Sequence, residues 1–483
     1  MNKPSSVRQF TRRHFLSENA MGVGMVALAT MLSEENLLGV PRTVKLQPDV
    51  YDLTPKQPVF QPAAKAMISL FQHGGPAHMD LFDPKPELTR LDGKTYDGDI
   101  GFSNLKQASK VLKGSPFKFH EHGEAGTAMS ELIPHIGSIA DDICLIRSMH
   151  TGHNGHEVSI RYMNAGIAGV TGRPGLGSWI TYGLGSESQN LPAYMVLTDP
   201  GGHPVDSTHN WSNGWMPSLF QGTVLRPKEP RILNLDAPQH LKGKVQSSNL
   251  AFLNKLNRRH ATRHPGEHDL EARIASYELA TRMQDAAREA LEISQETEAT
   301  HKLYGLDNDD TREYGTRCLI ARRLVERGVR FVQLFHSRQP WDNHNDLRNS
   351  LPSVCRKTDK PSAGLVKDLK QRGMLDEVLV HWGGEIGRLP VVEGDPNSGG
   401  RDHNGQGFST WLAGGGIKGG ITYGESDEVG HRAAENIVKP NDYQATVLKL
   451  FGIDHKNLVY LHNGQEQQLV VNSNARIVDD IIK

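Results

Sequence analysis

The sequence predicts an α/β fold in which helices cover both faces of a mostly parallel central sheet. Short apolar runs alternate with helical segments, and several of these runs end in a glycine-rich loop that contains histidine, aspartate or glutamate. Strands of a parallel sheet are buried on both faces and are therefore apolar throughout, as these runs are. We expect one large domain built on this plan.

Apolar runs that stop at polar or glycine-rich segments indicate the strands. The expected strands cover residues 66–71, 143–147, 329–335, 377–382 and 408–413. Apolar residues at helical spacing, with glycine or a capping residue at the ends, indicate the helices. The expected helices cover residues 130–140, 269–299, 313–327, 363–372 and 442–451, the last with Asn441 as its N-cap.

The amino-terminal segment, residues 1–39, is typical of an export signal. Residues 11–16 read TRRHFL and precede a weakly apolar run rich in glycine and alanine, which resembles a twin-arginine signal. That run is too short and too rich in glycine for a stable transmembrane span. We expect export by the twin-arginine route to the periplasm or the cell envelope.

The remaining chain divides into an extended lead-in and a folded domain. The lead-in covers residues 40–65, and a single α/β domain covers residues 66–483. An insertion is expected near residues 199–264, because this stretch is rich in Pro, Asn, His and Trp.

Charge and cysteine content narrow the classes of ligand. Lys and Arg number 54 against 55 Asp and Glu, so no net positive field would attract nucleic acid, and we expect no nucleic-acid partner. The 3 cysteines, Cys144, Cys318 and Cys355, lie far apart without a C-x-x-C motif, which argues against a thiolate zinc site. A metal would therefore be held by some of the 23 histidines together with carboxylates.

Metal-binding residue types follow the expected strands. In an open parallel sheet, ligands bind outside the carboxyl ends of the strands, so residues that follow different strands meet at one edge. Imidazole and carboxylate together suit a divalent metal, with zinc as the first choice and manganese or calcium as alternatives. The expected metal ligands are His73, Asp342, His344, Glu385, Asp402 and His403.

Alternative roles remain open for several of these residues. Glu385 follows an apolar strand, and Arg388 three residues later could neutralise it in place of a metal. Asp402 could orient His403 without touching the ion. His73 and the Asp342–His344 pair could each be satisfied by hydrogen bonds alone.

Four segments closely resemble the bacterial exported family known as domain of unknown function 1501. They are HGGPAHMDLFDPKPEL at 73–88, the run from GVRFVQLF to WDNHND at 328–346, GGEIGRLP at 383–390 and the glycine-rich segment at 399–430. The resemblance implies a branch of the alkaline phosphatase and sulfatase superfamily, with an alkaline-phosphatase-like fold. It also implies one or two metal ions at the carboxyl edge of the sheet, and hydrolysis of phosphate or sulfate esters.

The resemblance also indicates which residues correspond to the metal ligands of the superfamily, and it shows that this chain lacks the usual nucleophile motif. His73, Asp342, His344, Glu385 and His403 fall where the superfamily has metal ligands. The superfamily places a Ser, Thr or modified Cys nucleophile after the second strand, whereas this chain reads HNGHEVSIRYMNAG at 153–166, with His156 nearest that position and no C-x-P-x-R or S-x-P-x-R. Thr151 could be the nucleophile, His156 could be a nucleophile or an extra ligand, or a water activated by the metal could attack directly.

The expected function is an exported metal-dependent hydrolase of sulfate or phosphate esters, on a small molecule or a polysaccharide. Arg147 or Arg388 would offset the negative charge that develops during hydrolysis. The alternative is a non-catalytic protein that binds a glycan or a metal on the same fold, because the Ser or Cys nucleophile of the superfamily is missing. A third possibility is a structural partner in an envelope complex.

Overall fold

The computed structural model describes residues 51–103, 105–236, 238–241, 243–264 and 267–483. The expected export signal and residues 40–50 of the lead-in lie outside these ranges. The described residues belong to one compact unit. Across the described ranges, no helix combines the length and the apolar character needed to cross a membrane.

A mostly parallel sheet lies at the centre of this unit, which confirms the predicted fold class. In the described part of the chain it has 8 strands, in the order β12-β4-β11-β8-β1-β7-β5-β6. The strands in chain order are β1 (Ala66–Phe71), β4 (Ile143–Met149), β5 (Tyr194–Leu197), β6 (Thr223–Leu225), β7 (Phe331–Phe335), β8 (Val378–Gly383), β11 (Phe408–Ala413) and β12 (Ile421–Tyr423). Only β11 pairs antiparallel with its neighbours in this sheet of the described chain.

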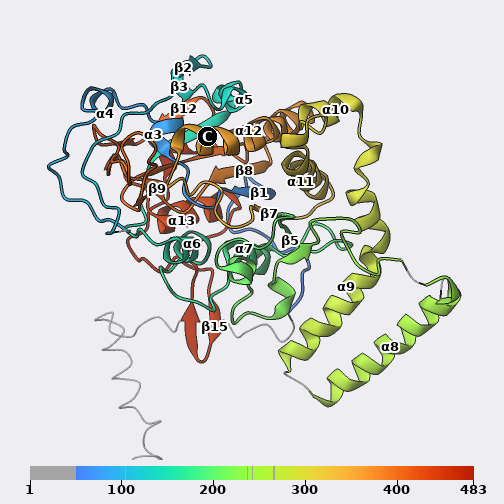
Figure 1. Cartoon of the computed structure of the whole chain (residues 1–483). Helices are drawn as coiled ribbons and strands as arrows, with labels where there is room; N and C mark the ends of the chain where they lie inside the picture. The colour runs from blue at the N-terminus through green and yellow to red at the C-terminus, as the bar shows by residue number, and fades with distance from the viewer. Residues whose placement is uncertain (1–50, 104, 237, 242, 265–266) are drawn as a thin grey trace, which may run out of the picture. The chain divides into compact units, whose positions relative to one another are not determined.

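Helices cover both faces of the sheet (Figure 1). The longer helices of the described chain, on the sheet or away from it, are α6 (His156–Ala165), α7 (Leu176–Leu184), α8 (Lys244–Arg263), α9 (His268–Leu291), α11 (Asp309–Glu326), α12 (Leu347–Gln371) and α13 (Pro440–Leu450). The shorter ones are α3 (His78–Leu81), α4 (Pro86–Arg90), α5 (Pro134–Gly137) and α10 (Glu298–Leu303). Helices α11 and α12 lie on one side of the strands, and α6, α7 and α13 lie on the other.

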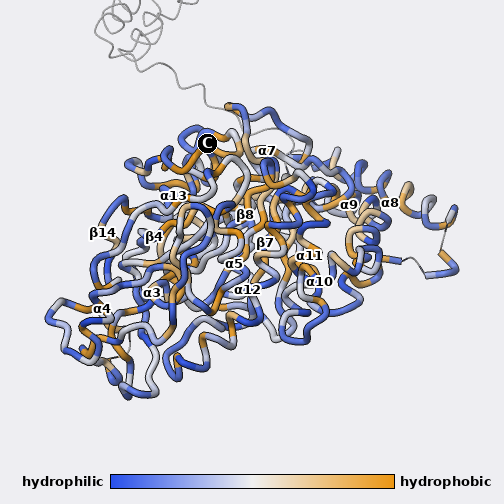
Figure 2. The backbone as a smooth tube through the Cα atoms, turned by 90° about the horizontal axis from the view of Figure 1, so that it is seen from above, coloured by the Kyte–Doolittle hydropathy of each residue, from blue (hydrophilic) through white to orange (hydrophobic). Residues whose placement is uncertain are grey.

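The core has two parts because successive side chains of a strand point to opposite faces. Ile68 and Leu70 of β1 pack in the cluster that contains α11 and α12, whereas Met67 and Phe71 pack in the cluster that contains α7 and α13. Figure 2 shows the apolar colour concentrated in the central strands and the polar colour at the periphery. A strand apolar at every position is thus buried on both sides, as the sequence predicted.

Several local predictions were wrong. Residues 130–140 do not form one helix: β3 (Thr127–Ser130) ends at the start of this stretch, and the only α-helix that the described residues form within it is the short α5, which Pro134 begins and Gly137 ends. Helix α12 begins well before the predicted residue 363 and continues through Pro352 and Pro361.

The predicted end of the helix at 269–299 and the predicted cap of the last helix also need correction. Helix α9 ends at Leu291, before the expected residue 299, and the stretch at 199–264, where we expect an insertion, contains the long helix α8. Helix α13 is capped by Lys439, while the Asn441 side chain bonds the Gly166 carbonyl oxygen at 3.1 Å.

The antiparallel direction of β11 positions its preceding loop. The amino-terminal end of an antiparallel strand lies at the same edge as the carboxyl ends of its parallel neighbours. His403 and Asn404 form β10 (His403–Asn404), which pairs antiparallel with β9 (Gly387–Arg388) just before β11 begins. Residues that precede β11 therefore meet those that follow β1, β7 and β8.

Close backbone contact at this edge requires glycine. A Cβ atom on Gly74 would lie 2.6 Å from the Asp342 nitrogen, and one on Gly405 would lie 2.1 Å from the His153 oxygen. Gly74 also has a φ of +108°, which a residue with a side chain rarely adopts. These two glycines let the loops approach one another closely enough for their side chains to meet.

A buried ion pair anchors the loop that carries His403. Arg401 donates from Nε to Asp80 Oδ2 at 2.7 Å and from Nη2 to Oδ1 at 3.1 Å, and both side chains are fully buried. Removing one partner leaves the other charge buried without compensation. The pair therefore fixes the position of residues 401–404 relative to α3.

We predict that Asp80→Ala lowers the free energy of unfolding by about 3–5 kcal/mol, because Arg401 loses its buried counter-charge. Denaturant titration measures the change. Lys65→Gln is the matched control, since Lys65 and Glu377 form an ion pair with side chains 58% and 54% exposed. An exposed pair contributes little, so this variant should unfold at the wild-type midpoint. Equal effects of the two substitutions would contradict the assigned role of the buried pair.

Candidate metal centre

Four side chains from three loops converge at the carboxyl edge of the sheet. His156 is the first residue of α6, after β4; Asp342 and His344 lie between β7 and α12; His403 precedes β11. We call these residues the imidazole–carboxylate cluster. His156 and His403 are separated by 247 residues along the chain, so only the fold brings them together.

The cluster is arranged around His403 Nε2 and Asp342 Oδ1. His403 Nε2 lies 2.8 Å from His156 Nε2, 3.0 Å from His344 Nε2 and 3.0 Å from Asp342 Oδ1. Asp342 Oδ1 lies 2.8 Å from His344 Nε2 and 3.4 Å from His156 Nε2. Three imidazole nitrogens thus surround one carboxylate oxygen.

Two further carboxylates determine which nitrogen of each ring carries the proton. His156 Nδ1 lies 2.6 Å from Glu385 Oε1, and His344 Nδ1 makes a short hydrogen bond with Glu393 Oε2. An ionised carboxylate only accepts, so each Nδ1 is the donor. A neutral ring protonated at Nδ1 has its lone pair on Nε2, which in both residues points into the cluster.

Lone pairs that face one another require a positive charge between them, either protons or a metal ion. Burial lowers the pKa of His156, but hydrogen bonds with Asp342 and Glu385 outweigh it and raise the pKa to about 9. Burial raises the pKa of Asp342, but hydrogen bonds from the three histidines hold it well below its ordinary value. Without a metal, the cluster therefore retains a proton at neutral pH.

The donor set also fits a divalent metal. His156, Asp342 and His403 form one candidate group, and His344, Asp402 and His403 form a second that shares His403. Zinc sites typically combine imidazole and carboxylate ligands. In such sites the ring nitrogen of histidine that does not bind the metal usually donates a hydrogen bond to a carboxylate. Glu385 and Glu393 supply that outer support for His156 and His344.

Asp402 has partners in the loops around the centre. Its Oδ1 accepts from the His403 amide at 2.7 Å, and its Oδ2 accepts from the Ser103 amide at 2.8 Å. The Ser103 hydroxyl makes a further short bond with Oδ1. These contacts orient His403, which is the alternative role that the sequence left open for Asp402. Asp402 also belongs to the second candidate metal-binding group, with His344 and His403.

His73 and Glu385 lie in the fully buried part of the site. Glu385 Oε1 accepts from the Gly74 amide at 3.0 Å, whereas its Oε2 and both ring nitrogens of His73 are buried without a hydrogen-bond partner among the described residues. Burial lowers the pKa of His73 to about 4, so the ring is neutral at neutral pH. Neither residue belongs to a candidate group within the described chain.

Arg388 does not neutralise Glu385. Its guanidinium is fully buried and donates to the carbonyl oxygens of Gly75 at 3.0 Å and Arg401 at 3.1 Å, with short bonds to Gly74 and Asp342. Arg388 therefore supports Asp342, and the counter-charge of Glu385 is His156. This placement also argues against the expected contact of Arg388 with developing charge on a substrate.

Thr151 and Arg147 have partners outside the cluster. The Thr151 hydroxyl donates to the His153 oxygen at 3.2 Å and the Gly405 oxygen at 3.4 Å. Arg147 Nε lies 3.7 Å from Asp83 Oδ1. The structure therefore brings neither of them into the imidazole–carboxylate cluster.

Glu393 and Ser103 support the site but carry no signal in the sequence. Glu393 lies in a stretch without a recognisable motif, and its role depends on His344, 49 residues away. Ser103 lies in a loop that reaches Asp402 across 299 residues. No local pattern distinguishes either residue from an ordinary polar loop residue.

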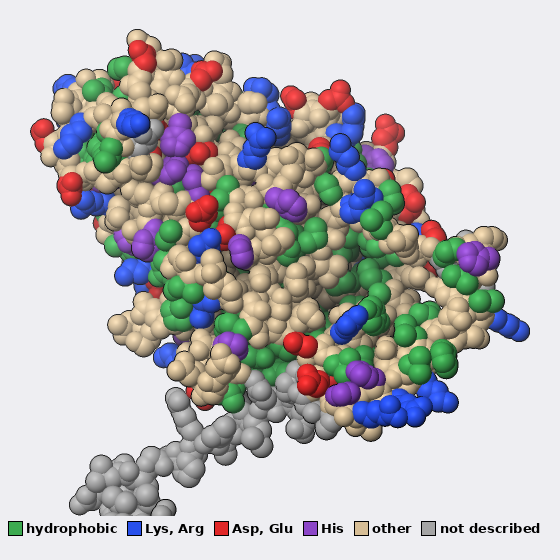
Figure 3. All heavy atoms as spheres, turned by 60° about the horizontal axis from the view of Figure 1, so that its bottom comes forward, with side chains coloured by type: hydrophobic (Ala, Val, Ile, Leu, Met, Phe, Trp, Pro, Cys, Tyr) green, Lys and Arg blue, Asp and Glu red, His purple; other side chains and the backbone are tan. Residues whose placement is uncertain are grey.

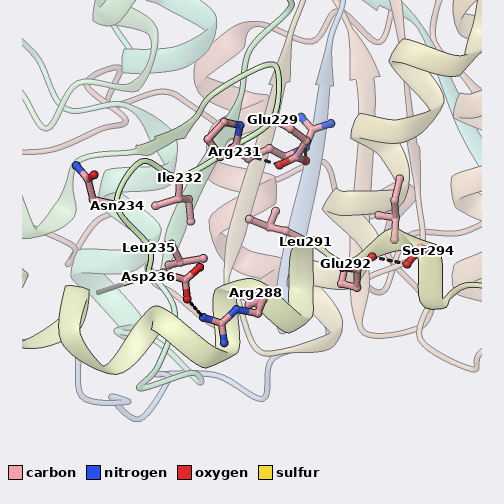
Figure 4. A pocket seen from close by; sticks show the side chains of 12 residues that line it. Glu229, Arg231, Ile232, Asn234, Leu235, Asp236, Arg288, Leu291, Glu292 and Ser294 are labelled. Atoms are coloured by element: carbon pink, nitrogen blue, oxygen red, sulfur yellow. Dashed lines mark hydrogen bonds and ion pairs between the residues drawn. The ribbon is translucent and has the colours of Figure 1, made fainter. Parts of the chain in front are cut away.

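A cavity of about 720 Å³ lies elsewhere, between the loop around Arg231 and the end of α9 (Figure 4). Arg231 pairs with Glu229 at 2.9 Å, and Arg288 makes a short bond with Asp236. None of its lining residues belongs to the cluster. This cavity is therefore separate from the candidate metal centre.

Comparison with solved structures finds distant similarity. The PsFucS1 sulfatase from Pseudoalteromonas sp. is 12% identical, with a TM-score of 0.36 over 89% of this chain and 71% of that chain. The lipoteichoic acid synthase LtaP from Listeria monocytogenes is 10% identical, with a TM-score of 0.33 over 86% and 78%. The phosphonate monoester hydrolase SpPMH from Silicibacter pomeroyi is 9% identical, with a TM-score of 0.32 over 72% and 71%.

A search of curated proteins finds no match. The family model described as protein of unknown function (DUF1501) matches residues 64–482, which include every residue of the imidazole–carboxylate cluster. The chain therefore belongs to the DUF1501 family.

Proposed function

We propose that this protein is an exported metal-dependent hydrolase of sulfate or phosphate esters. The observation that carries the proposal is the convergence of three imidazole nitrogens on Asp342 Oδ1, with carboxylates behind two of the rings. Export is proposed from the twin-arginine-like residues at 11–16.

His156, Asp342, His344 and His403 would hold the ion, and zinc is the first choice because nitrogen ligands predominate. When bound, a divalent ion supplies Lewis-acid polarisation of an ester oxygen and lowers the pKa of water. His344, Asp342 and His403 are 24%, 19% and 12% exposed at the side chain, whereas Glu385 is fully buried. Substrate would therefore approach from the side of His344.

The chain's own residues hold this arrangement rigid before substrate arrives. Glu385 keeps the proton of His156 at Nδ1, and Glu393 does the same for His344. Arg388 fixes the Asp342 carboxylate from behind. A site held in this way does not have to reorganise during the reaction, which favours catalysis.

We favour direct attack by a water molecule over a covalent intermediate on Thr151. The Thr151 hydroxyl is occupied by two backbone oxygens, and no histidine of the cluster contacts it in the described chain. A serine or threonine nucleophile needs an adjacent base to remove its proton. His156, with one nitrogen on Glu385 and the other in the cluster, fits a ligand better than a nucleophile.

The second candidate function is a non-catalytic protein that binds a metal or a glycan. It is favoured by His156 standing at the position where a nucleophile is expected from the family resemblance. Both functions use the same metal centre, so only turnover of an ester separates them.

We predict that gently purified wild-type protein contains a stoichiometric divalent metal and that His403→Ala loses it. His403 belongs to both candidate groups, so its loss disrupts either arrangement. Elemental analysis by mass spectrometry measures the metal content. His120→Ala, on the exposed side of β2 (Phe119–His122), is the control and should retain the metal. Metal-free wild-type protein that also fails to take up zinc would count against the proposal.

We predict a pH-dependent stability in chelator-treated protein. The folded-state pKa of His156 is raised from 6.5 to about 9, so its protonated form stabilises the fold below pH 6.5, and this contribution disappears as the pH rises through about 9. The loss amounts to about 3 kcal/mol and should be absent in His156→Gln.

Denaturant titrations between about pH 6 and about pH 10 measure this loss. Saturating zinc should reverse the trend, because zinc competes with protons for the imidazoles and binds more tightly as they are removed. A chelated wild-type protein whose stability does not fall over this range would contradict the assigned protonation.

We predict that zinc- or manganese-loaded protein hydrolyses an aryl sulfate or an aryl phosphate. His156→Ala should lower kcat/KM by about 100-fold or more, since it removes a ligand, while Thr151→Val should stay within about threefold of wild type. Steady-state assays with matched metal loading measure both. Loss of activity in Thr151→Val with full metal content would support a covalent mechanism, and binding of a sulfated glycan without turnover would support the non-catalytic alternative.

A further inference from the structure

Helix α8 (Lys244–Arg263) stands apart from the sheet beside α9, at the lower right of Figure 1. Its 20 residues include no buried side chain, which is unusual for a helix of this length in a folded unit. Figure 2 shows it with apolar and polar stretches in alternation. Its two long faces have different surroundings.

One face of α8 packs against α9. The partly buried residues recur every three or four positions, which is the spacing of one helical face. They are Gln246, Leu250, Asn254, Asn257 and Ala261. Gln246 Nε2 donates to Gln284 Oε1 at 3.1 Å, and Arg258 lies 3.7 Å from Glu278. Packing against α9 therefore explains the partial burial of this face of α8 and leaves the opposite face exposed.

The opposite face exposes an apolar stripe. Val245, Phe252 and Leu256 are 47%, 63% and 46% exposed. They follow one another by seven and four residues, so they lie on the same side of the helix. Neighbouring large apolar side chains that remain in water usually mark an interaction surface.

Basic residues accompany this stripe, and acidic ones are missing from the helix. The Lys and Arg residues of α8 are Lys244, Lys255, Arg258, Arg259 and Arg263, and its sequence contains no Asp or Glu. Arg259 follows Phe252 by seven residues, and Arg263 follows Leu256 by seven, so both arginines share the apolar face. Figure 3 shows blue and green side chains adjoining one another on the helices at the lower right.

We propose that α8 docks this protein onto a membrane surface that contains anionic lipid. A helix with an apolar stripe bordered by Lys and Arg lies in the interface plane, with its apolar side chains among the upper acyl chains and its cations at the phosphates. The stripe lies on an outward-facing helix, which suits a planar surface. The chain as a whole has a net charge of -1, so this attraction is local to α8.

The test is co-sedimentation of the full-length chain with vesicles of phosphatidylethanolamine and phosphatidylglycerol, compared with phosphatidylcholine vesicles. Wild type should bind the anionic vesicles, and binding should weaken at high salt because screening reduces the charge attraction. Phe252→Ser with Leu256→Ser, and separately Arg259→Glu with Arg263→Glu, should each weaken binding by about tenfold or more. Residues 1–50 are identical in every variant, so any contribution they make is constant.

Matched exposed substitutions control for general effects. Val471→Ser removes an apolar side chain that is 45% exposed, and Arg356→Glu reverses a charge that is 62% exposed. Both controls should bind like wild type, and all variants should keep the wild-type metal content and melting temperature. The proposal would be overturned if the α8 variants bound anionic vesicles as well as wild type does. It would also be overturned if wild type bound phosphatidylcholine vesicles as well as anionic ones, or bound neither. Absence of vesicle binding together with capture of an acidic protein would instead assign α8 to a protein partner.

Discussion

The inner lone pairs of His156 and His344 and a carboxylate oxygen of Asp342 cannot face one another without positive charge between them, and much of the site follows from this constraint. Glu385 and Glu393 hold protons on the outer nitrogens of His156 and His344, so the inner nitrogens are acceptors. A proton can supply the positive charge, as the raised pKa of His156 shows. A divalent ion supplies it more effectively, because one ion satisfies several lone pairs at once.

The fold maintains this unfavourable arrangement of acceptors by anchoring each loop independently. Arg388 holds Asp342 from behind, and the buried Arg401–Asp80 pair holds the segment that leads to His403. Gly74 allows the loop after β1 to contact the backbone at Asp342. Because these anchors do not belong to the cluster, the loops should keep their positions whether protons or a metal occupy the centre.

Charged residues on the surface helix α8 differ in their surroundings from those at the candidate metal centre. At the candidate metal centre, the buried Arg388 bonds Asp342 and the buried Glu385 pairs with His156, whereas the basic residues of α8 are exposed and that helix contains no acidic residue. Buried charges need partners within the fold, but exposed ones are free to attract a partner from outside. The proposed chemistry at the cluster and the proposed attachment through α8 therefore depend on different residues.

The sequence by itself determined the α/β class and the residue types at the sheet edge, because apolar strands and the polar residues that follow them are local patterns. Asp342, His344 and His403 were identified in this way, whereas His156 was singled out by the family resemblance, as a nucleophile or an extra ligand. Only the tertiary structure decided that Arg388 supports Asp342, that Glu393 orients His344 and that His73 lies in the fully buried part of the site. Hydrogen-bond partners and protonation depend on neighbours in space, and here those neighbours come from strands, one of them antiparallel, that are far apart along the chain.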